Sequence, residues 1–190
     1  MRVQDLEKKE ALFEATVKLV NEIGFASSSV SKIAKEAGVS PSTLYVYHEN
    51  KEDLLVSTYV TIKQKMSEAV LVDFDASLPV RDVVRSVWLR MFRYVSEHTE
   101  YYQYCEQFAN SPYSEKVNRA VLEQYFGPIF KVIERGMAEK IIKDLEQPLL
   151  VAFLFHPLTF LANPRLSHGF VLTDDHVDLA FDMTWDAIKF

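Results

Sequence analysis

The sequence predicts an all-α protein with an N-terminal three-helix domain and a C-terminal helical domain. Apolar residues recur at spacings of three and four along most of the chain, which is typical of amphipathic helices. No segment shows the alternation of apolar and polar residues between hairpin turns that indicates strands. Hydrophobic residues make up 48% of the 190 positions, which excludes a disordered chain and allows one or two domains with real cores.

The first four helices are expected in the N-terminal part of the chain. Apolar periodicity places them at residues 4–23, 29–36, 41–47 and 51–72. Ser40 is a good N-cap and Pro41 suits a first helical position, so the third helix has a defined start. The fourth helix carries an unbroken apolar stripe, formed by Leu55, Tyr59, Ile62, Met66 and Val70.

The remaining helices follow a linker over residues 73–79. They are expected at residues 79–97, 99–110, 114–139, 148–162 and 173–190. Pro128 and Pro157 should bend the helices that contain them, because proline cannot donate the interior hydrogen bond. Residues 163–172 should form a loop. We therefore divide the chain into a first domain over residues 1–50, a linking helix over 51–72 and a second domain over 73–190.

Residues 24–51 have the pattern of two short helices joined by a tight turn. Ala34 is small enough for two helices to cross closely, and Gly38 can adopt the positive φ that ends a helix. Leu44 then holds the second helix on the first. This spacing is that of a helix-turn-helix, whose second helix enters the major groove of DNA with its N-terminal end.

The same segment resembles the DNA-binding segment of the tetracycline-repressor (TetR) family of bacterial transcriptional regulators. The resemblance covers roughly the first third of the chain and rests on Gly24-Phe25, Ser28-Ser29-Val30, Ile33-Ala34, Ala37-Gly38-Val39-Ser40, Thr43-Leu44-Tyr45, Tyr47 and Lys51-Glu52-Asp53-Leu54. Ser42 and His48 depart from the glycine and phenylalanine that the family often has. The resemblance implies a homodimeric repressor that a small, mostly apolar effector releases from a palindromic DNA operator.

Ten residues are candidates for DNA contact. Helix starts offer free N–H groups to phosphate, tyrosine hydroxyls can reach phosphate oxygens, and small polar side chains can reach base edges. The set is Ser28, Ser29, Ser40, Pro41, Ser42, Thr43, Tyr45, Tyr47, His48 and Lys51. By the resemblance, Tyr45 and Lys51 match the family's phosphate contacts. Tyr45 and Tyr47 cannot point the same way, so one of them is expected in the core.

The aromatic-rich region between residues 88 and 160 is the candidate effector site. Small-molecule sites are usually apolar pockets with a few polar groups, although aromatic stripes on helices are more often core. The candidate lining residues are Trp88, Phe92, Tyr101, Tyr104, Cys105, Phe108, Tyr125, Phe126, Ile129, Phe155, His156 and Phe160.

The last two helices are the candidate dimer interface. Residues 148–162 are apolar on too many sides for one interface, and the resemblance places both helices in a four-helix bundle between two protomers. The candidate residues are Leu150, Phe153, Leu154, Leu161, Val177, Phe181, Trp185 and Ile188. The alternative is that both helices only close the core of one chain.

The charge distribution gives no general basic surface for DNA. The net charge is −6, and residues 1–72 contain 9 basic and 10 acidic side chains. DNA attraction therefore depends on the placement of a few cations, for which the candidates are Arg2, Lys8, Lys9, Lys32, Lys35 and Lys51. The polar N-terminus is unlike a signal peptide, and no apolar run reaches the roughly 18 residues of a membrane span, so a cytoplasmic protein without membrane contact is expected.

The sequence contains no pattern for an enzyme, a cofactor or a metal. A Gly-rich phosphate loop, a nucleophile elbow and a zinc signature are all missing from the sequence. A thiol sensor at Cys105 and a metal site combining it with Glu97, His98 and Glu106 are weak alternatives, because a second cysteine and a helical histidine pair are lacking. Two other classes remain open: a DNA-binding protein without an effector, and a small-molecule-binding protein that has lost DNA binding.

Overall fold

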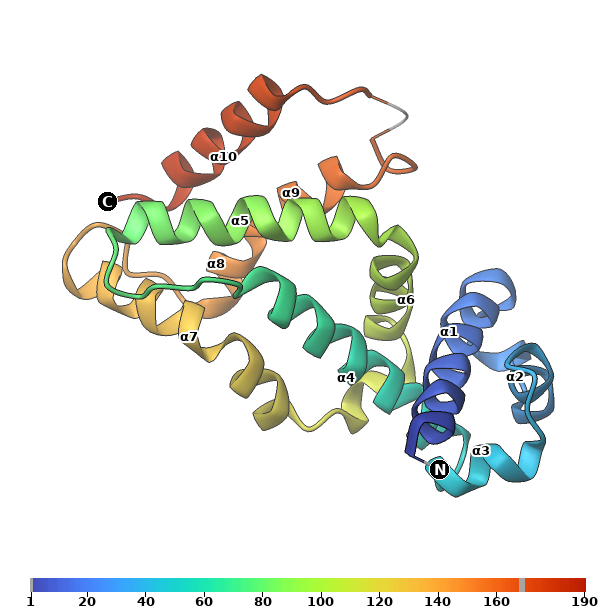
Figure 1. Ribbon diagram of the computed structural model, residues 1–190. Helices are drawn as coiled ribbons and strands as arrows, with labels where there is room; N and C mark the ends of the chain where they lie inside the picture. The colour runs from blue at the N-terminus through green and yellow to red at the C-terminus, as the bar shows by residue number, and fades with distance from the viewer. Residues whose placement is uncertain (1, 168–169) are drawn as a thin grey trace. The chain divides into compact units, whose positions relative to one another are not determined.

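The computed structural model describes residues 2–167 and 170–190, with side chains from residue 5 onward, and confirms the all-α prediction (Figure 1). The elements are α1 (Arg2–Ser27), α2 (Val30–Glu36), α3 (Pro41–Tyr47), α4 (Lys51–Val70), α5 (Val80–Glu97), α6 (Thr99–Ala109), η1 (Pro112–Lys116), α7 (Arg119–Ala138), α8 (Gln147–Leu154), α9 (His156–Ala162) and α10 (Asp174–Ile188). Within the described ranges, every helix is too short or too polar to cross a lipid bilayer. The predicted 163–172 loop includes His168 and Gly169, which lie outside the described residues.

The observed helices differ from the expected ones at three breaks. α1 continues four residues beyond the expected end at residue 23, but Gly24 within it is not helical, with φ 75° and ψ 167°. The expected helix at 148–162 is two helices, α8 and α9, and Pro157 occupies the first turn of α9, where its missing N–H costs nothing. The expected helix at 114–139 is the 3₁₀ turn η1 followed by α7, which contains Pro128 in its interior.

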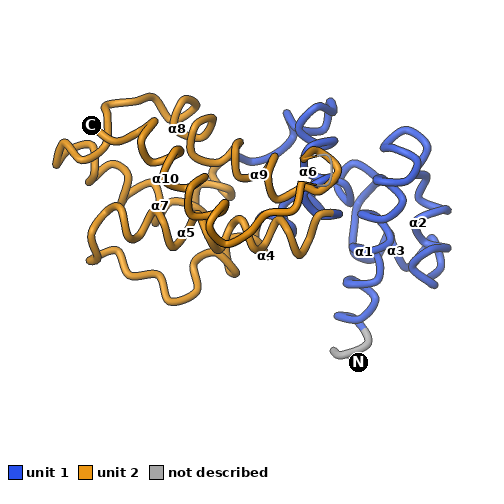
Figure 2. The backbone as a smooth tube through the Cα atoms, turned by 90° about the horizontal axis from the view of Figure 1, so that it is seen from above, with its two compact units in different colours: residues 1–63, 100–119 blue, residues 64–99, 120–190 orange. Residues whose placement is uncertain are grey.

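The chain forms two compact units, whose boundaries differ from the predicted domain boundaries (Figure 2). Residues 1–63 and 100–119 form the first unit, and residues 64–99 and 120–190 form the second. The predicted first domain ended at residue 50 and did not include α6. In the structure, α6 packs with the N-terminal helices because its aromatic residues complete their core.

The first unit is held together by two groups of side chains. A buried cluster of Leu12, Ala15, Ile33, Leu44 and Leu54 joins α1 to α4. A second, aromatic group joins α6 to the end of α1. The ring of Phe25 has three ring centroids within 5.5–6.0 Å of its own, those of Tyr104, Phe108 and Tyr113. The Tyr104 hydroxyl also donates to the Leu55 carbonyl at 2.8 Å. These contacts fix α6 to the three-helix segment.

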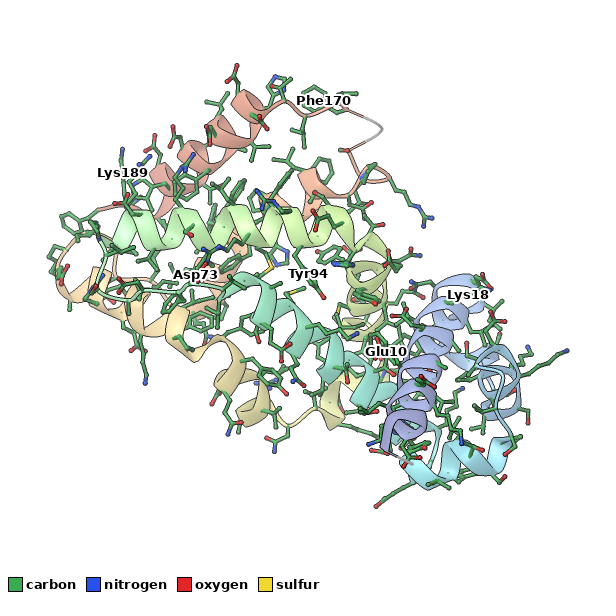
Figure 3. The ribbon with its side chains drawn as sticks, viewed as in Figure 1. Glu10, Lys18, Asp73, Tyr94, Phe170 and Lys189 are labelled. Atoms are coloured by element: carbon green, nitrogen blue, oxygen red, sulfur yellow. The ribbon has the colours of Figure 1, made fainter. Side chains whose placement is uncertain are left out.

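The second unit is built around α5, which packs against α9 and α10, while α10 also packs against α8. Trp88 of α5 is fully buried and its Nε1 donates to the Leu154 carbonyl at 2.9 Å. Phe181 of α10 packs on Trp88 with ring centroids 5.8 Å apart. At the end of the chain, Lys143 N donates to Ile188 O at 2.9 Å and Phe190 N donates to Ile141 O at 3.0 Å, which ties the α7–α8 connection to the end of α10. Lys189, labelled in Figure 3, follows α10 and forms an isolated antiparallel β-bridge with Ile142 of this connection.

Gly136 of α7 lies in close contact with Val80 and Ile142 in the second unit. This contact predicts that a larger residue at position 136 lowers the stability of the fold. A Cβ atom there would come 2.8 Å from Val80 Cγ1 and 2.9 Å from Ile142 Cδ1. We expect Gly136→Ala to lower the free energy of unfolding by about 1–3 kcal/mol, because the added methyl group overpacks the core. Urea unfolding followed by circular dichroism measures the change.

Gly127 of the same helix is the matched control. Apart from its chain neighbours and the backbone of its own helix, no described atom lies within 4 Å of the position that its Cβ would occupy. Gly127→Ala should therefore lack the overpacking cost and change the free energy of unfolding by less than about 1 kcal/mol, since the better helix propensity of alanine is opposed by the restriction that Pro128 places on the residue before it. An equal loss of stability in both variants, or a loss in neither, would contradict the assigned contact.

Candidate nucleic-acid interface and effector region

The α2–α3 segment has the predicted helix-turn-helix geometry. Gly38 has φ 68°, and Val39 N donates to Ala34 O at 2.9 Å, which closes the turn. The Ser40 hydroxyl accepts from Thr43 N at 3.2 Å and therefore caps α3, with Pro41 in its first turn. Leu44 is fully buried against α1, α2 and α4. The opposite side of α3 is left for an external partner.

The side of α3 away from Leu44 carries four of the ten candidate DNA-contact residues. Pro41 and Ser42 are exposed, and Thr43 is half-buried. The Ser40 hydroxyl lies 2.7 Å from that of Ser42 and 2.9 Å from that of Thr43. Tyr45 is 56% exposed and Val46 is 75% exposed. The sequence prediction did not include Val46, because an apolar residue in a helix is normally assigned to the core.

The first predicted phosphate contact, Ser28, is corrected by the structure. Its side chain is fully buried and its hydroxyl donates at 2.8 Å to the Gly24 carbonyl, which also accepts from Ser28 N at 3.2 Å. Ser29 is exposed and caps α2 by accepting from Lys32 N at 3.3 Å. Of the two serines, only Ser29 is exposed, so its phosphate contact stays a prediction.

Tyr47 and Lys51 make contacts inside the protein. The Tyr47 hydroxyl donates to Asp5 Oδ1 at 2.8 Å, and the Lys9 ammonium lies 5.4 Å from the centroid of its ring. Tyr47 packs on the core cluster, so it is the inward member of the Tyr45–Tyr47 pair. Lys51 Nζ donates to Phe25 O at 2.6 Å, and burial lowers its pKa. Lys51 therefore joins the start of α4 to the end of α1.

Four of the other predicted cations are exposed, namely Lys8, Lys9, Lys32 and Lys35. The side chain of the fifth, Arg2, lies outside the described residues. Lys32 Nζ donates to Ser27 O at 3.1 Å, close to the start of α2. Lys18 of α1, labelled in Figure 3, pairs with Glu36 at 2.5 Å. The exposed cations of this unit are thus few, as the charge count suggested.

His48 lies at the end of the recognition helix α3 and is half-buried. Its Nδ1 lies 3.3 Å from Asp53 Oδ2 and 3.3 Å from Ser57 Oγ, both on α4. Asp53 also accepts from Glu49 N at 3.2 Å. The imidazole therefore links α3 to α4, whereas the sequence prediction placed it at a base edge.

This position of His48 predicts a pH dependence of stability. Burial lowers its pKa, although Asp53 raises it and Lys9 lowers it further. The unfolded chain therefore binds a proton near the ordinary histidine pKa, about 6.5, more readily than the folded protein does. Stability is retained above that pH and should fall as the pH decreases through and below it. Thermal unfolding at pH 7.5 and pH 5.5 measures the loss.

The control for this prediction is His48→Phe, which fills the site without titrating. We expect this variant to lose less stability than the wild-type protein over the same pH interval. An equal loss in both proteins would assign the pH dependence to other groups.

The twelve predicted effector residues do not fall in one unit. Four of them lie on α6 in the first unit: Tyr101, Tyr104, Cys105 and Phe108. All four are buried there, and their polar groups have protein contacts: the Tyr101 hydroxyl donates to Glu14 and the Tyr104 hydroxyl to Leu55 O. Burial raises the pKa of both tyrosines.

The other eight lie in the second unit. Trp88 and Ile129 are core residues, and Phe92 stacks on Trp88 at 6.0 Å. Three more are half-buried, namely Tyr125, Phe126 and Phe155, and two are exposed, namely His156 and Phe160. Trp88 has its indole N–H satisfied by the chain, so it is placed as a core residue. No single pocket within either unit is shown to collect the twelve residues.

The structure shows a hollow in the first unit that the sequence did not predict. Its volume is about 610 Å³, and it lies between the end of α1 and the end of α6. The lining residues are Phe25, Ala26, Glu106, Gln107, Asn110, Ser111, Pro112 and Tyr113. None of the predicted effector residues is among them. Among the described residues, no group of three or more histidine, cysteine or acidic side chains is arranged to hold a metal ion.

The candidate dimer residues are corrected by burial. Five of the eight are buried within the chain, where a second chain cannot reach them: Leu150, Leu154, Phe181, Trp185 and Ile188. Phe153 is exposed, while Leu161 and Val177 are half-buried. Two pairs of apolar residues, each spaced by one helical turn, are exposed on these helices. They are Leu149 and Phe153 on α8, and Leu179 and Met183 on α10. The candidate interface on these helices therefore stays a prediction, and its five buried residues are removed from it.

The fold and the exposed side of α3 define a helix-turn-helix DNA-binding protein. Residues 9–58 match the family model for bacterial regulatory proteins of the tetR family, and residues 79–189 match the tetracyclin repressor-like C-terminal domain. The chain belongs to the TetR family of transcriptional regulators. Regulators of this family bind operator DNA and effector ligands, and they function as dimers.

Relatives and solved structures agree with this assignment. A TetR family transcription regulator from Marinobacter aquaeolei VT8 is 36% identical, with a TM-score of 0.89 and coverage of 100% of this chain and 99% of that one. An uncharacterized helix-turn-helix transcriptional regulator of Haemophilus influenzae is 28% identical over 189 residues, which is 100% of both chains. The fatty acid metabolism regulator of Bacillus subtilis is 42% identical over 67 residues, but the match spans only 33% of its length.

Proposed function

We propose that the protein is a homodimeric, cytoplasmic repressor that binds a palindromic DNA operator and is released from it by a small effector. The observation that carries this proposal is the division of α3 into two sides. Leu44 is fully buried in the core, while Ser42 and Tyr45 are exposed on the same short helix. A helix fixed on one side, with exposed polar side chains near its start, is suited to reading a DNA groove.

The contacts of the DNA-binding unit support distinct roles for its residues. Ser29, the α3 residues Ser42 and Thr43, and Tyr45 are proposed to face DNA. Ser40 and Pro41 form the capped start of α3, and Tyr47, His48 and Lys51 set its position through their contacts with α1 and α4. Ser28 is not included, because its hydroxyl is buried.

The exposed apolar residues of α8 and α10 support dimerisation. Leu149 and Phe153 lie one turn apart on α8, and Leu179 and Met183 lie one turn apart on α10. Apolar patches of this kind are typical of protein interfaces. In a symmetric dimer, the two recognition helices would contact half-sites about 34–36 Å apart, one turn of DNA.

Response to a small molecule is supported by the family and by one whole-length relative. The nicotine-responsive transcriptional repressor of Paenarthrobacter nicotinovorans is 22% identical over 190 residues. At this identity, the relative supports an effector response and not the same effector. Binding that couples to the operator by about 1–3 kcal/mol would change operator affinity about 5- to 150-fold.

Fluorescence anisotropy on DNA from upstream of the protein's own coding sequence tests the proposal. Unrelated DNA of equal length is the control, and salt is raised through the physiological range because non-specific binding is salt-labile. A preference for the upstream DNA that persists at physiological salt supports the regulator. Equal, salt-labile binding to both DNAs would contradict an operator in this upstream DNA. An operator affinity that stays the same with every effector tested would contradict release of the protein from DNA by an effector.

A further inference from the structure

The hollow between the end of α1 and the end of α6 has no role in the function proposed above. All its lining residues belong to the first unit, and its volume of about 610 Å³ lies within the range of roughly 300–1,000 Å³ that is usual for small-molecule sites. The aromatic part of its wall is formed by Phe25 and Tyr113, whose ring centroids lie 5.6 Å apart. Both side chains are half-buried, so part of each remains open to a ligand.

Two amide side chains in the wall are held in defined orientations. Asn110 Nδ2 donates to the Glu106 carbonyl at 2.9 Å, and Gln107 Nε2 donates to Asn21 Oδ1 at 3.0 Å. Asn21 is oriented in turn, because its Nδ2 donates to the Glu100 carbonyl at 2.8 Å and a carbonyl can only accept. The amide oxygens of Gln107 and Asn110 therefore remain available as hydrogen-bond acceptors in the wall of the hollow.

Glu106 gives the hollow a negative charge. Among the eight lining residues, all of them described, Glu106 alone is charged, and its side chain is half-buried. In the described part of the chain, no cation forms an ion pair with its carboxylate. Glu106 also lies in the last turn of α6, which has no basic residue although the helix dipole favours a cation there. Lys51, whose Nζ binds the Phe25 carbonyl, is not a lining residue.

This combination of groups selects one class of ligand. A cation is attracted both by a carboxylate and by the faces of aromatic rings. An anion would be repelled by Glu106 and by the end of the helix dipole. A wholly apolar molecule would remove the carboxylate from water without giving it a partner, which is unfavourable. An apolar molecule that carries one positive charge satisfies both the rings and the carboxylate.

We propose that this hollow binds an organic ammonium ion with an apolar or aromatic body. The ammonium group donates hydrogen bonds to the Glu106 carboxylate, and the apolar body lies against the rings of Phe25 and Tyr113. The site is in the first unit and includes none of the twelve residues of the candidate effector region. The proposal therefore does not depend on the effector response proposed above.

Isothermal titration calorimetry on the purified full chain, without DNA, tests the proposal. The probes are two pairs, each an amine and an alcohol with the same apolar body: 2-naphthylmethylamine with 2-naphthylmethanol, and 4-phenylbutylamine with 4-phenylbutanol. At neutral pH both amines are cations. We expect the wild-type protein to bind at least one amine about three- to tenfold more tightly than its alcohol, the range for a partly exposed ion pair together with a contact between a cation and an aromatic ring.

Variants of Glu106 test the role of the charge. Glu106→Gln keeps the size of the side chain, and it should lower the affinity for the preferred amine about threefold or more and leave that for the alcohol unchanged. Glu106→Asp keeps the charge and should keep a preference for the amine. The matched control is Glu123→Gln, which removes an exposed glutamate of α7 in the second unit and should bind all four probes as the wild-type protein does.

A further variant tests the location of the site. Ala26 is an exposed residue of the wall, so Ala26→Phe adds a large side chain to the hollow and should weaken binding of both members of the preferred pair. The proposal is wrong if neither amine is preferred over its alcohol, including the case in which no probe binds. It is also wrong if Glu106→Gln keeps the full preference, or if Ala26→Phe binds both members of the pair as the wild-type protein does.

Discussion

Replacing Trp88 by alanine should lower the free energy of unfolding by about 3–5 kcal/mol, the range for removal of a large aromatic side chain from a core. The indole is fully buried, packs on Phe92 and Phe181, and donates its N–H to the Leu154 carbonyl at 2.9 Å. Its removal leaves a cavity and an unsatisfied carbonyl. Urea unfolding followed by circular dichroism measures the change.

Trp88→Phe is the control, because it keeps a ring but loses the donor. We expect a smaller loss, about 1–3 kcal/mol, from the carbonyl left without its partner. The same variant addresses the sequence prediction that Trp88 contacts the effector. Unchanged effector affinity in Trp88→Phe would fit a core residue, whereas an alanine variant as stable as the wild-type protein would contradict the packing described for α5.

Replacing Tyr45 by phenylalanine should weaken operator binding about 30- to 150-fold, if each hydroxyl contributes about 1–1.5 kcal/mol and a homodimer loses two of them. Tyr45 is 56% exposed on α3, so its hydroxyl is free to approach a phosphate. A phosphate contact carries no base preference, and unrelated DNA should therefore lose affinity by a similar factor. Anisotropy titrations on both DNAs measure the two factors.

Tyr47→Phe is the matched control on the same helix. Its hydroxyl donates to Asp5 within the protein, so its loss should affect stability more than operator affinity. Similar losses of affinity in the two variants would show that both hydroxyls, or neither, contact DNA. A Tyr45→Phe variant that binds as tightly as the wild-type protein would exclude a phosphate contact of its hydroxyl.

Local chemistry explains why much of the DNA-binding unit could be predicted from the sequence. A positive φ at Gly38, a cap at Ser40 and a proline in the first turn of α3 are properties of a few adjacent residues. The spacing of Leu44 after this turn fixes which side of α3 is buried. The two short helices α2 and α3 were therefore expected within one residue of their observed bounds.

The remaining features depend on how neighbouring segments turn back on one another, which the local residue pattern does not determine. Ser28 is next to Ser29 and chemically identical, but an interrupted α1 turns one hydroxyl inward and leaves the other exposed. His48 meets Asp53 and Ser57 only because α4 returns past the end of α3. On α8 and α10, the apolar pattern cannot separate the side that fills the chain's own core from the side that is exposed, because both sides carry apolar residues.

Cys105 makes this protein convenient for measuring the separation of its recognition helices. It is the single cysteine of the sequence, it is buried, and burial raises the pKa of its thiol, so the reactive thiolate is scarce at neutral pH. A Ser42→Cys substitution would add one accessible thiol per protomer on α3 without any need to remove the native one. Spin labels attached at this position would report the distance between the two α3 helices of a dimer. The distance measured without and with effector can then be compared with the roughly 34–36 Å between successive turns of DNA.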